Sequence, residues 1–140
     1  MSLYLFDTDT FSHSLRSHPV VTAHISRNKS LHQLGLSIIS VEELWDGWQA
    51  VIRKAKSSAQ LGSTYGRLTA TLTEIQKWMI WSFTEVSADR YLILRKLKLN
   101  VGANDLRIAA IALELGAVLV TANTRDFSRI PNLVLEDWTK

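Results

Sequence analysis

Short runs of consecutive apolar residues alternate along the chain with longer segments of helical spacing. Residues 3–6 (LYLF) form one such run, and residues 34–39 (LGLSII) form a second. A continuously apolar run is typical of a strand that is covered on both faces, as in a parallel sheet. Directly afterwards, residues 41–55 carry apolar side chains at helical spacing. Because Ser40 stands three residues before Glu43, which is the pattern of a capping box, we expect the helix to begin there.

The middle of the chain predicts one long amphipathic helix over residues 59–81. Its apolar residues form a stripe along one face of the helix, which predicts packing in the core or a contact within a helical hairpin. A dimer or partner surface is the alternative. We also expect a short strand over residues 82–86, a helix over 88–97 and a turn over 101–104. The apolar residues of the stripe follow one another in steps of four and three: Leu61, Tyr65, Leu68, Leu72, Ile75 and Met79.

The segment that begins at Asn104 is the least ambiguous unit. Asn104 is placed to cap a helix that continues through residues 106–115 (LRIAAIALEL). Gly116 predicts the end of that helix, and a strand follows over residues 117–123. Strands that alternate with helices imply right-handed crossovers and a parallel sheet. We therefore predict an α/β fold of three layers, in which helices flank a central, mainly parallel sheet.

Composition narrows the class of protein. An apolar fraction of 46% in 140 residues suits a single domain over residues 1–140. The chain has no cysteine, which excludes a disulfide framework and a thiolate metal site and favours a reducing, cytoplasmic setting. Four histidines are scattered over residues 13–32, and we expect them at the surface. Residues 108–122 are the most apolar stretch, but a glutamate and a glycine interrupt it and it is too short for a membrane helix, so we expect no membrane association.

Acidic side chains follow the predicted strands at the same end. In an open parallel sheet the strand-to-helix loops open at the carboxyl edge, where ligands bind. Asp7 follows the first strand, Glu43 lies one helical turn after the second, and Asp105 begins a helix. Asn123 and Asp126 follow the last clear strand. Carboxylates brought together repel one another, so such a cluster needs a cation, and oxygen ligands without cysteine suit Mg²⁺ or Mn²⁺. Metal-activated water would then attack the phosphorus of a phosphate ester.

Each of these acids also has a purely structural explanation. Asp7 or Asp9 can cap the first helix, which is the preferred interpretation for Asp9, whereas Asp7 is interpreted as a ligand. Glu43 can complete the capping box, Asp105 can complement a helix dipole, and Asp126 can be an ordinary turn residue. Only their coincidence at one edge of the sheet favours a metal site.

Five stretches of the sequence carry a resemblance to a known family: LFDTDT, ISVEELWDG, VGANDLRIAAIALELGA, LVTANTRDFSRIPNL and LEDW. They occur in the order and spacing of the PIN-domain ribonucleases, and the chain most closely resembles the VapC-like toxins of type II toxin–antitoxin systems. The resemblance implies an endoribonuclease that depends on Mg²⁺ or Mn²⁺ and selects its RNA substrate by sequence or structure. It also implies a homodimer and a cognate antitoxin whose C-terminal segment covers the acidic site.

The same resemblance assigns roles to individual residues. Asp7, Glu43 and Asp105 occupy the three core acidic positions. Thr8 and Thr121 would support the site through hydroxyl hydrogen bonds. We expect Asp7 and Asp105 to hold the cation directly, and Glu43 to bind it through water or to orient the attacking water.

Two positions depart from the family's pattern. Asp9 stands where the family often has Asn, and Asn123 stands where its fourth acid often lies. Because an amide cannot supply that charge, Asp126 is the nearest substitute, and either Asp126 or Asn123 would complete the shell. Arg125 and Arg129 are candidates for contacts to RNA phosphates, with solvated surface residues as the alternative. The net charge of +3 and the pI near 9.4 permit such a polyanionic partner without requiring one.

Two other functions fit part of the sequence. The opening LYLFDTDT resembles the strand and DxDxT motif of haloacid-dehalogenase-like phosphotransferases, in which Asp7 would be the nucleophile and Asp9 the acid and base. Ala103 stands where that family needs a further acid, and 140 residues leave little room for its cap. The second alternative is a non-catalytic RNA-binding module with a PIN-like fold, against which three mutually repelling carboxylates argue.

Overall fold

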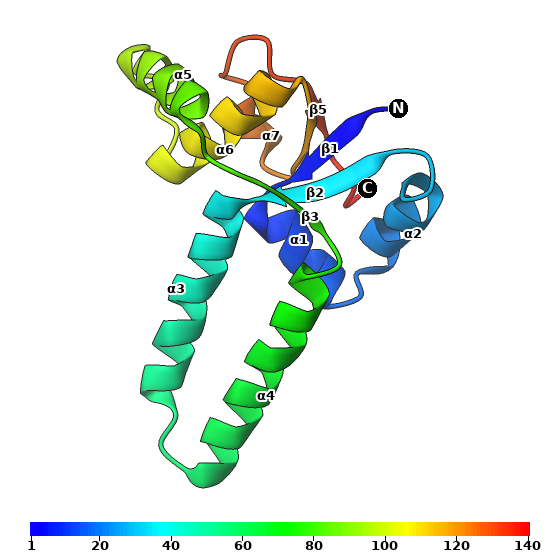
Figure 1. Cartoon of the computed structure of the whole chain (residues 1–140), viewed down its shortest axis with the longest axis vertical. Coiled ribbons are helices and arrows are strands. Elements are labelled where there is room, and N and C mark those ends of the chain that lie inside the picture. Colours follow the sequence, from blue (N-terminus) through cyan, green and yellow to red (C-terminus); the bar gives the residue numbers. More distant parts are fainter.

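A computed structural model describes residues 1–140, and its strands form one parallel sheet. Figure 1 shows β1 in the middle of this sheet, with the helices arranged around it. The strand order is β3-β2-β1-β4-β5, and each neighbouring pair is parallel. The strands are β1 (Leu3–Phe6), β2 (Gln33–Ser37), β3 (Met79–Trp81), β4 (Val118–Val120) and β5 (Leu135–Glu136).

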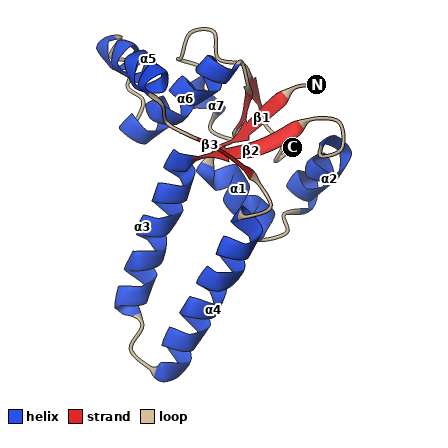
Figure 2. Ribbon diagram, viewed as in Figure 1, coloured by secondary structure: helices blue, strands red, loops and turns tan.

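Helices cover both faces of the sheet, which confirms the predicted three-layer α/β fold. Residues of α5, α6 and α7 build the core on one face, and residues of α1 and α2 build the core on the other. Helices α3 and α4 form a hairpin that extends away from the sheet (Figure 2). The helices are α1 (Thr8–Leu15), α2 (Pro19–Asn28), α3 (Ile38–Lys54), α4 (Ser58–Ile75), α5 (Glu85–Lys96), α6 (Ala103–Leu115) and α7 (Thr124–Phe127).

The central position of β1 explains why its sequence is apolar throughout. Side chains alternate between the two faces of a strand. Leu5 accordingly joins the core beneath α6, whereas Tyr4 and Phe6 join the opposite core with Phe11 and Trp138. Both faces of β1 are therefore buried, as the continuous apolar run predicts.

The register of the sheet aligns the ends of three strands. Phe6 at the end of β1 pairs with Leu36 of β2 and with Val120 of β4. The residues that follow, Asp7 after β1 and Thr121 after β4, consequently leave the sheet side by side at its carboxyl edge. This is the edge at which parallel α/β sheets bind ligands.

The predicted second strand extends too far. Strand β2 ends at Ser37, and the residues expected to continue it form the first turn of α3. Ser37, not Ser40, caps this helix, because the Ser37 hydroxyl accepts a hydrogen bond from the backbone N–H of Ser40 at 3.1 Å. The predicted capping box of Ser40 and Glu43 is therefore wrong. An apolar run does not reveal where a buried strand becomes a buried helix, and Ile39 is buried although it belongs to the helix.

The predicted helix over residues 59–81 is two elements. Helix α4 ends at Ile75, and Met79–Trp81 form the edge strand β3, which pairs with β2. The strand expected over residues 82–86 is wrong, because Thr84 caps α5, which begins at Glu85 with a capping box. The apolar spacing of the helix continues into the edge strand, so periodicity alone misses the boundary.

Most of the predicted apolar stripe on α4 lies outside the core. Leu61, Tyr65 and Leu72 are 40%, 51% and 44% exposed, and only Ile75, at the end nearest the sheet, is buried among the stripe residues of α4. The stripe therefore lies mostly outside the core, on a helix that forms a hairpin with α3, which is the second of the two predicted contacts. The alternative of a partner surface remains open for these three residues.

The unit over residues 103–120 follows its prediction in type, but β4 is shorter than the predicted strand over residues 117–123, and the last two residues of the predicted turn over 101–104 belong to α6. Helix α6 runs from Ala103 and ends at Gly116, whose φ of +64° is the left-handed conformation that favours glycine. The cap at its start is Gly102 and not Asn104, whose side chain instead accepts a hydrogen bond from Arg107 at 2.6 Å. Helix α5 begins three residues earlier than the segment 88–97 predicts.

Two further expectations concern the histidines and membranes. All four histidines are half-buried, and three of them contact backbone groups of other residues: His18, His24 and His32. No helix in the structure combines the length and the apolar character needed to cross a bilayer.

Candidate active site

Asp7 is held by both of its carboxylate oxygens. One oxygen, Oδ1, accepts a hydrogen bond from the backbone N–H of Thr10 at 2.8 Å, and so Asp7 caps α1. The other, Oδ2, accepts a hydrogen bond from the hydroxyl of Thr121 at 2.6 Å. Asp9, which was expected to cap this helix, is an exposed residue of its first turn, because α1 begins immediately after Asp7. The cap and ligand interpretations of Asp7 are therefore compatible.

Burial raises the pKa of Asp7 above its usual range. The side chain is only 6% exposed. The hydrogen bonds from Thr121 and Thr10 lower the pKa, and the nearby charge of Asp9 raises it again. Because desolvation is the largest of these effects, the carboxylate form of Asp7 is disfavoured without a nearby positive charge.

Thr8 connects the first helix to the third. Its hydroxyl lies 2.6 Å from Oε1 of Glu43, to which it donates, and 2.9 Å from the hydroxyl of Ser40. Ser40 is fully buried, so its side chain belongs to this network and not to a helix cap. Glu43 is thus oriented by a hydroxyl from another element, which the expected capping box would not provide. The sequence pattern predicts a helix cap at Ser40, since a serine three residues before a glutamate indicates a capping box.

Asp105 lies close enough to acidic residues of other segments for their charges to shift its pKa. Its pKa is raised to about 6 by burial first, and then by the charges of Glu43, Asp7, Asp126 and Asp9. Asp105 lies in the first turn of α6. Carboxylates that are far apart in the sequence therefore share one region at the carboxyl edge of the sheet, as the topology predicts.

The loop after β4 supplies the remaining polar groups. The Thr121 hydroxyl accepts a hydrogen bond from the backbone N–H of Asn123 at 2.9 Å. Asn123 caps α7, and its side-chain amide donates to Asp126 Oδ2 at 3.2 Å. Arg129 Nη1 lies 3.2 Å from the other oxygen of Asp126, with both side chains about one third exposed. Arg125 is exposed in α7. Asp126 therefore contacts the side chains of both Asn123 and Arg129, so it is more than a simple turn residue. Through this contact Arg129 lies next to the acidic cluster.

The donor chemistry of this cluster fits a hard divalent cation. The chain contains one other ion pair, Lys77 with Glu74, so no lysine or arginine neutralises Asp7, Glu43 or Asp105. Oxygen donors with unmet negative charge suit Mg²⁺ or Mn²⁺. The side chains do not yet stand in a ligating arrangement, because no group of three or more acidic or histidine residues could hold a metal ion as placed.

Comparison with known proteins identifies the fold family. The sequence profile of the PIN domain matches residues 4–133. The chain belongs to the PIN-domain family. The sequence resemblance recognised from five short stretches is thereby confirmed, and the match spans the acidic residues from Asp7 to Asp126.

Full-length relatives of this PIN domain include named ribonucleases. Ribonuclease VapC2 of Rickettsia felis is 28% identical over an alignment of 142 positions that covers 99% of each protein. The tRNA(fMet)-specific endonuclease VapC of Salmonella typhimurium is 28% identical over 140 positions, again covering 99% of each. Among solved structures, DNA-bound VapBC from Salmonella typhimurium matches with a TM-score of 0.78 at 26% identity over 99% of both chains. VapBC2 from Rickettsia felis, bound to a promoter DNA fragment, matches with a TM-score of 0.74 at 28% identity over 97% of this chain and 98% of that one.

The PIN domain accounts for features that the phosphotransferase alternative leaves unexplained. The PIN-domain match covers residues 4–133, whereas the phosphotransferase resemblance rests on the opening LYLFDTDT. Glu43 and its contact to Thr8 also have no place in that alternative. The family match and the geometry together decide against a haloacid-dehalogenase-like enzyme.

Proposed function

We propose that this PIN domain is the ribonuclease toxin of a type II toxin–antitoxin pair and that it hydrolyses internal phosphodiester bonds of RNA. The observation that carries the proposal is the convergence of Asp7, Glu43 and Asp105 at the carboxyl edge of the sheet, where the pKa of Asp105 rises to about 6. Relatives that match over their full length are named ribonucleases, which supports the same activity.

The acidic cluster would take Mg²⁺ or Mn²⁺, with Asp7 and Asp105 as direct ligands. A bound divalent cation supplies a nucleophilic water at neutral pH and neutralises charge on the phosphate oxygens. Thr121 fixes the orientation of Asp7 through a buried hydrogen bond. Asp126 would complete the shell in preference to Asn123, because a carboxylate supplies a negative charge that an amide does not.

Glu43 is the proposed acceptor for the proton of the attacking water. Its Oε1 accepts a hydrogen bond from Thr8, which fixes the carboxylate and leaves Oε2 without a partner in the protein. An oriented carboxylate with one free oxygen can position a water and accept its proton. Thr8 and Ser40 act here as positioning residues for Glu43.

The partner of the toxin would be a cognate antitoxin that covers the acidic site. Solved structures of similar chains are VapBC assemblies, including VapBC-1 from nontypeable Haemophilus influenzae with a TM-score of 0.75 at 29% identity. The Rickettsia felis VapBC2 structure contains a fragment of promoter DNA. We extend the toxin–antitoxin pairing to this chain on the strength of these matches.

A homodimer would form through the exposed face of α5. Val86, Ile93 and Leu97 lie on one face of this segment and are 56%, 61% and 49% exposed. The helix begins with Glu85 and ends with Lys96. A two-fold axis perpendicular to the helices generates an antiparallel pair, in which each end of a helix lies against the opposite end of its copy. Such a pair would place acidic beside basic residues. This charge distribution supports a second copy of the chain as the occupant of the face.

Nuclease assays in parallel with a phosphatase assay test the proposed activity. The purified chain is incubated with structured RNA and with a small phosphomonoester, each with Mg²⁺, Mn²⁺ or EDTA. We expect internal RNA cuts that disappear in EDTA and in Asp7→Asn, since this change removes a proposed ligand with little change in shape. Asp9→Asn, which alters an exposed acid of the same turn, is the matched control and retains cleavage.

Three outcomes would contradict the proposal. RNA cleavage that survives Asp7→Asn excludes the metal mechanism. Release of phosphate from the monoester that depends on Asp9 supports a phosphotransferase instead. Retained RNA binding without cleavage under any metal supports the non-catalytic module.

A further inference from the structure

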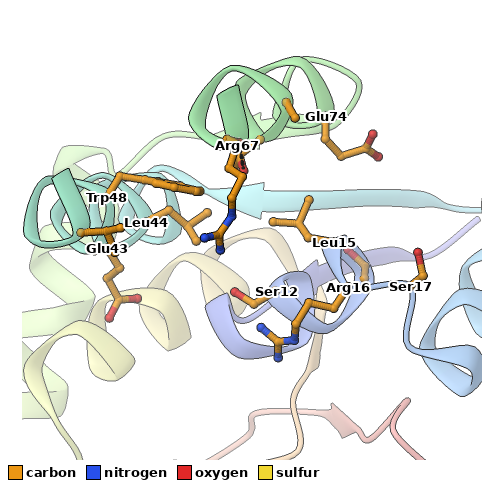
Figure 3. Close-up of a pocket in the computed structure, with 14 residues that line it drawn as sticks. Ser12, Leu15, Arg16, Ser17, Glu43, Leu44, Trp48, Arg67 and Glu74 are labelled. Atoms are coloured by element: carbon orange, nitrogen blue, oxygen red, sulfur yellow. Dashed lines mark hydrogen bonds between the residues drawn. The ribbon is translucent and has the colours of Figure 1, made fainter. Parts of the chain in front are cut away.

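A groove of about 910 Å³ opens between α1, α3 and α4, beside the acidic cluster. Glu43 lies at one end of it, so the groove and the candidate active site share a residue. Figure 3 shows Ser12 and Arg16 on the α1 side, Leu44 and Trp48 on α3, and Arg67 reaching in from α4. A substrate strand that enters the acidic cluster from this side would therefore pass along the groove.

The groove carries two positive charges that have no carboxylate partner. Glu74 also lines the groove but pairs with Lys77, and the other ion pair, Arg129 with Asp126, lies outside it. Arg16 contacts only the ring nitrogen of His13, at 3.3 Å. Arg67 and Arg16 are both exposed. Unpaired guanidinium groups beside a negatively charged site are suited to hold a polyanion that the site itself repels.

The wall of the groove also offers an aromatic surface. The guanidinium carbon of Arg67 lies 5.4 Å from the centre of a Trp48 ring. Stacked arginine and aromatic side chains are the groups on which unpaired nucleic acid bases stack. The hydroxyl of Ser12 faces the same space from α1 (Figure 3). Charge, stacking surface and hydroxyl donors thus occur together along one path to Glu43.

We infer that this groove binds the single-stranded RNA substrate, with Arg16 and Arg67 on its phosphates and Trp48 beneath a base. The inference rests on the proposed ribonuclease function and adds the route by which RNA reaches the acidic cluster. Apolar residues such as Leu15 and Leu44 also line the groove, which would suit a peptide of a protein partner. The two free guanidinium groups favour RNA, because phosphates occur at every step of its backbone.

RNA binding without cleavage tests the inference directly. Binding of a fluorescent single-stranded RNA is measured by anisotropy in EDTA, in an Asp105→Asn background that cannot cut. We expect Arg16→Ala with Arg67→Ala to raise the Kd about tenfold and to lower the slope of log Kd against log salt by about 1.4, which corresponds to two lost phosphate contacts. Arg27→Ala with Arg53→Ala removes the same charge from exposed residues outside the groove and is the matched control.

A third variant separates charge from stacking. Arg67→Lys keeps the positive charge but loses the planar group above Trp48, so we expect the salt slope of the parent with a weaker Kd. Far-ultraviolet circular dichroism confirms folding of each variant. Equal Kd values for the groove and control variants overturn the inference and leave the groove to a peptide partner.

Cleavage by the otherwise unmodified chain distinguishes failure of this inference from failure of the proposed function. If the chain cuts RNA and the groove variant retains the KM of the parent, only the groove assignment is wrong. If the parent chain cuts no RNA with either metal, the ribonuclease function itself is wrong. A raised KM at nearly unchanged kcat in the groove variant supports both.

Discussion

Asp105 lies half-buried in the field of four other carboxylates, and its pKa of about 6 stands well above the ordinary aspartate value of 3.8. A raised pKa in the folded state means that the folded chain binds the proton more tightly than the unfolded chain does. Between these two pKa values, stability consequently falls as the pH rises. Above about pH 6 the carboxylate is charged in both states, and its burial, together with repulsion from the neighbouring carboxylates, destabilises the fold.

We therefore expect Asp105→Asn to stabilise the metal-free protein near neutral pH. The amide carries no charge, so the repulsion from Glu43 and Asp7 is lost. At about pH 4, where Asp105 is protonated in the folded chain, the same change should have little effect. Thermal unfolding in EDTA at both pH values measures the difference in Tm.

Two comparisons complete this experiment. Asp46→Asn changes an exposed acid of α3 and should leave the Tm difference between the two pH values as it is in the parent. Addition of Mn²⁺ near neutral pH should raise the Tm of the parent more than that of Asp105→Asn, because binding to the folded state stabilises it. A variant that gains no more stability near neutral pH than at low pH would contradict the electrostatic interpretation.

At the scale of single residues, sequence and topology could predict which acids come together but not how they are held. Asp7 and Asp105 follow from the rule that strand-to-helix loops meet at one edge. Asp7 both caps α1 and accepts a hydrogen bond from Thr121. Spacing could not predict that one residue has both roles, because each role alone would place a carboxylate directly after a strand. Ser40 belongs to the site because its hydroxyl contacts the hydroxyl of Thr8. A local sequence pattern cannot predict a contact between residues that are distant in the sequence.

At the scale of elements, the pairing of β2 with β3 depends on Gly35. A Cβ atom at this position would lie 2.5 Å from a ring carbon of Trp81 and 2.9 Å from the backbone oxygen of Met79. Backbone cannot move aside as a flexible side chain can, and Gly35 is buried between its neighbours. The edge strand therefore packs closely on β2 only because no side chain intervenes.

Gly35→Ala should destabilise the protein by about 1–3 kcal/mol, since overpacking in a well-packed site costs that much. Gly62→Ala is the matched control, because Gly62 lies within α4 with nothing near its Cβ position. Alanine is the better helix former, so this control should be stabilised by up to about 1 kcal/mol. Urea unfolding gives both free energies, and equal effects of the two changes would show that β3 does not pack as described.

The ends of an element could be predicted from the sequence where a characteristic residue, such as an aspartate or a glycine, marks them. Other ends could not be predicted. Strand β1 is bounded by Asp7, and α6 ends at a glycine with positive φ, so both were predicted within a few residues. The boundary between α4 and β3 lacks such a signal, because Trp78 and Met79 continue the apolar spacing of the helix. The end of β2 was misplaced for the same reason, as Ile38 and Ile39 suit a strand and a helix equally.

At the scale of the whole molecule, three surfaces serve three different ligands in the proposed function. The acidic cluster lies at the carboxyl edge of the sheet, the groove lies between α1, α3 and α4, and the apolar face of α5 lies on the layer that covers the opposite face from α1. The order of strands and helices in the sequence predicts the layers. It does not predict which apolar residues stay exposed, because exposure depends on which elements meet in space.

The exposed face of α5 gives a prediction about the assembly of the chain. A glutamate at Ile93, which is 61% exposed, should convert a dimer to a monomer, since it places a charge in the centre of the two-fold contact without entering the core. Leu31→Glu makes the same change at a residue between α2 and β2 that is 65% exposed, and should leave the dimer intact. Size-exclusion chromatography with light scattering gives both masses.

The charges at the ends of α5 test the antiparallel arrangement separately from its apolar centre. Glu85→Lys would place like charges opposite each other near the ends of the pair and should weaken the dimer. Adding Lys96→Glu to the same chain restores opposite charges in an antiparallel pair, so the double variant should dimerise more tightly than Glu85→Lys alone. In a parallel pair each end faces the same end of the copy, so the second substitution would exchange one like-charge pair for another and leave the repulsion unchanged. A double variant that dimerises no better than Glu85→Lys therefore excludes the antiparallel contact, even if Ile93→Glu is monomeric.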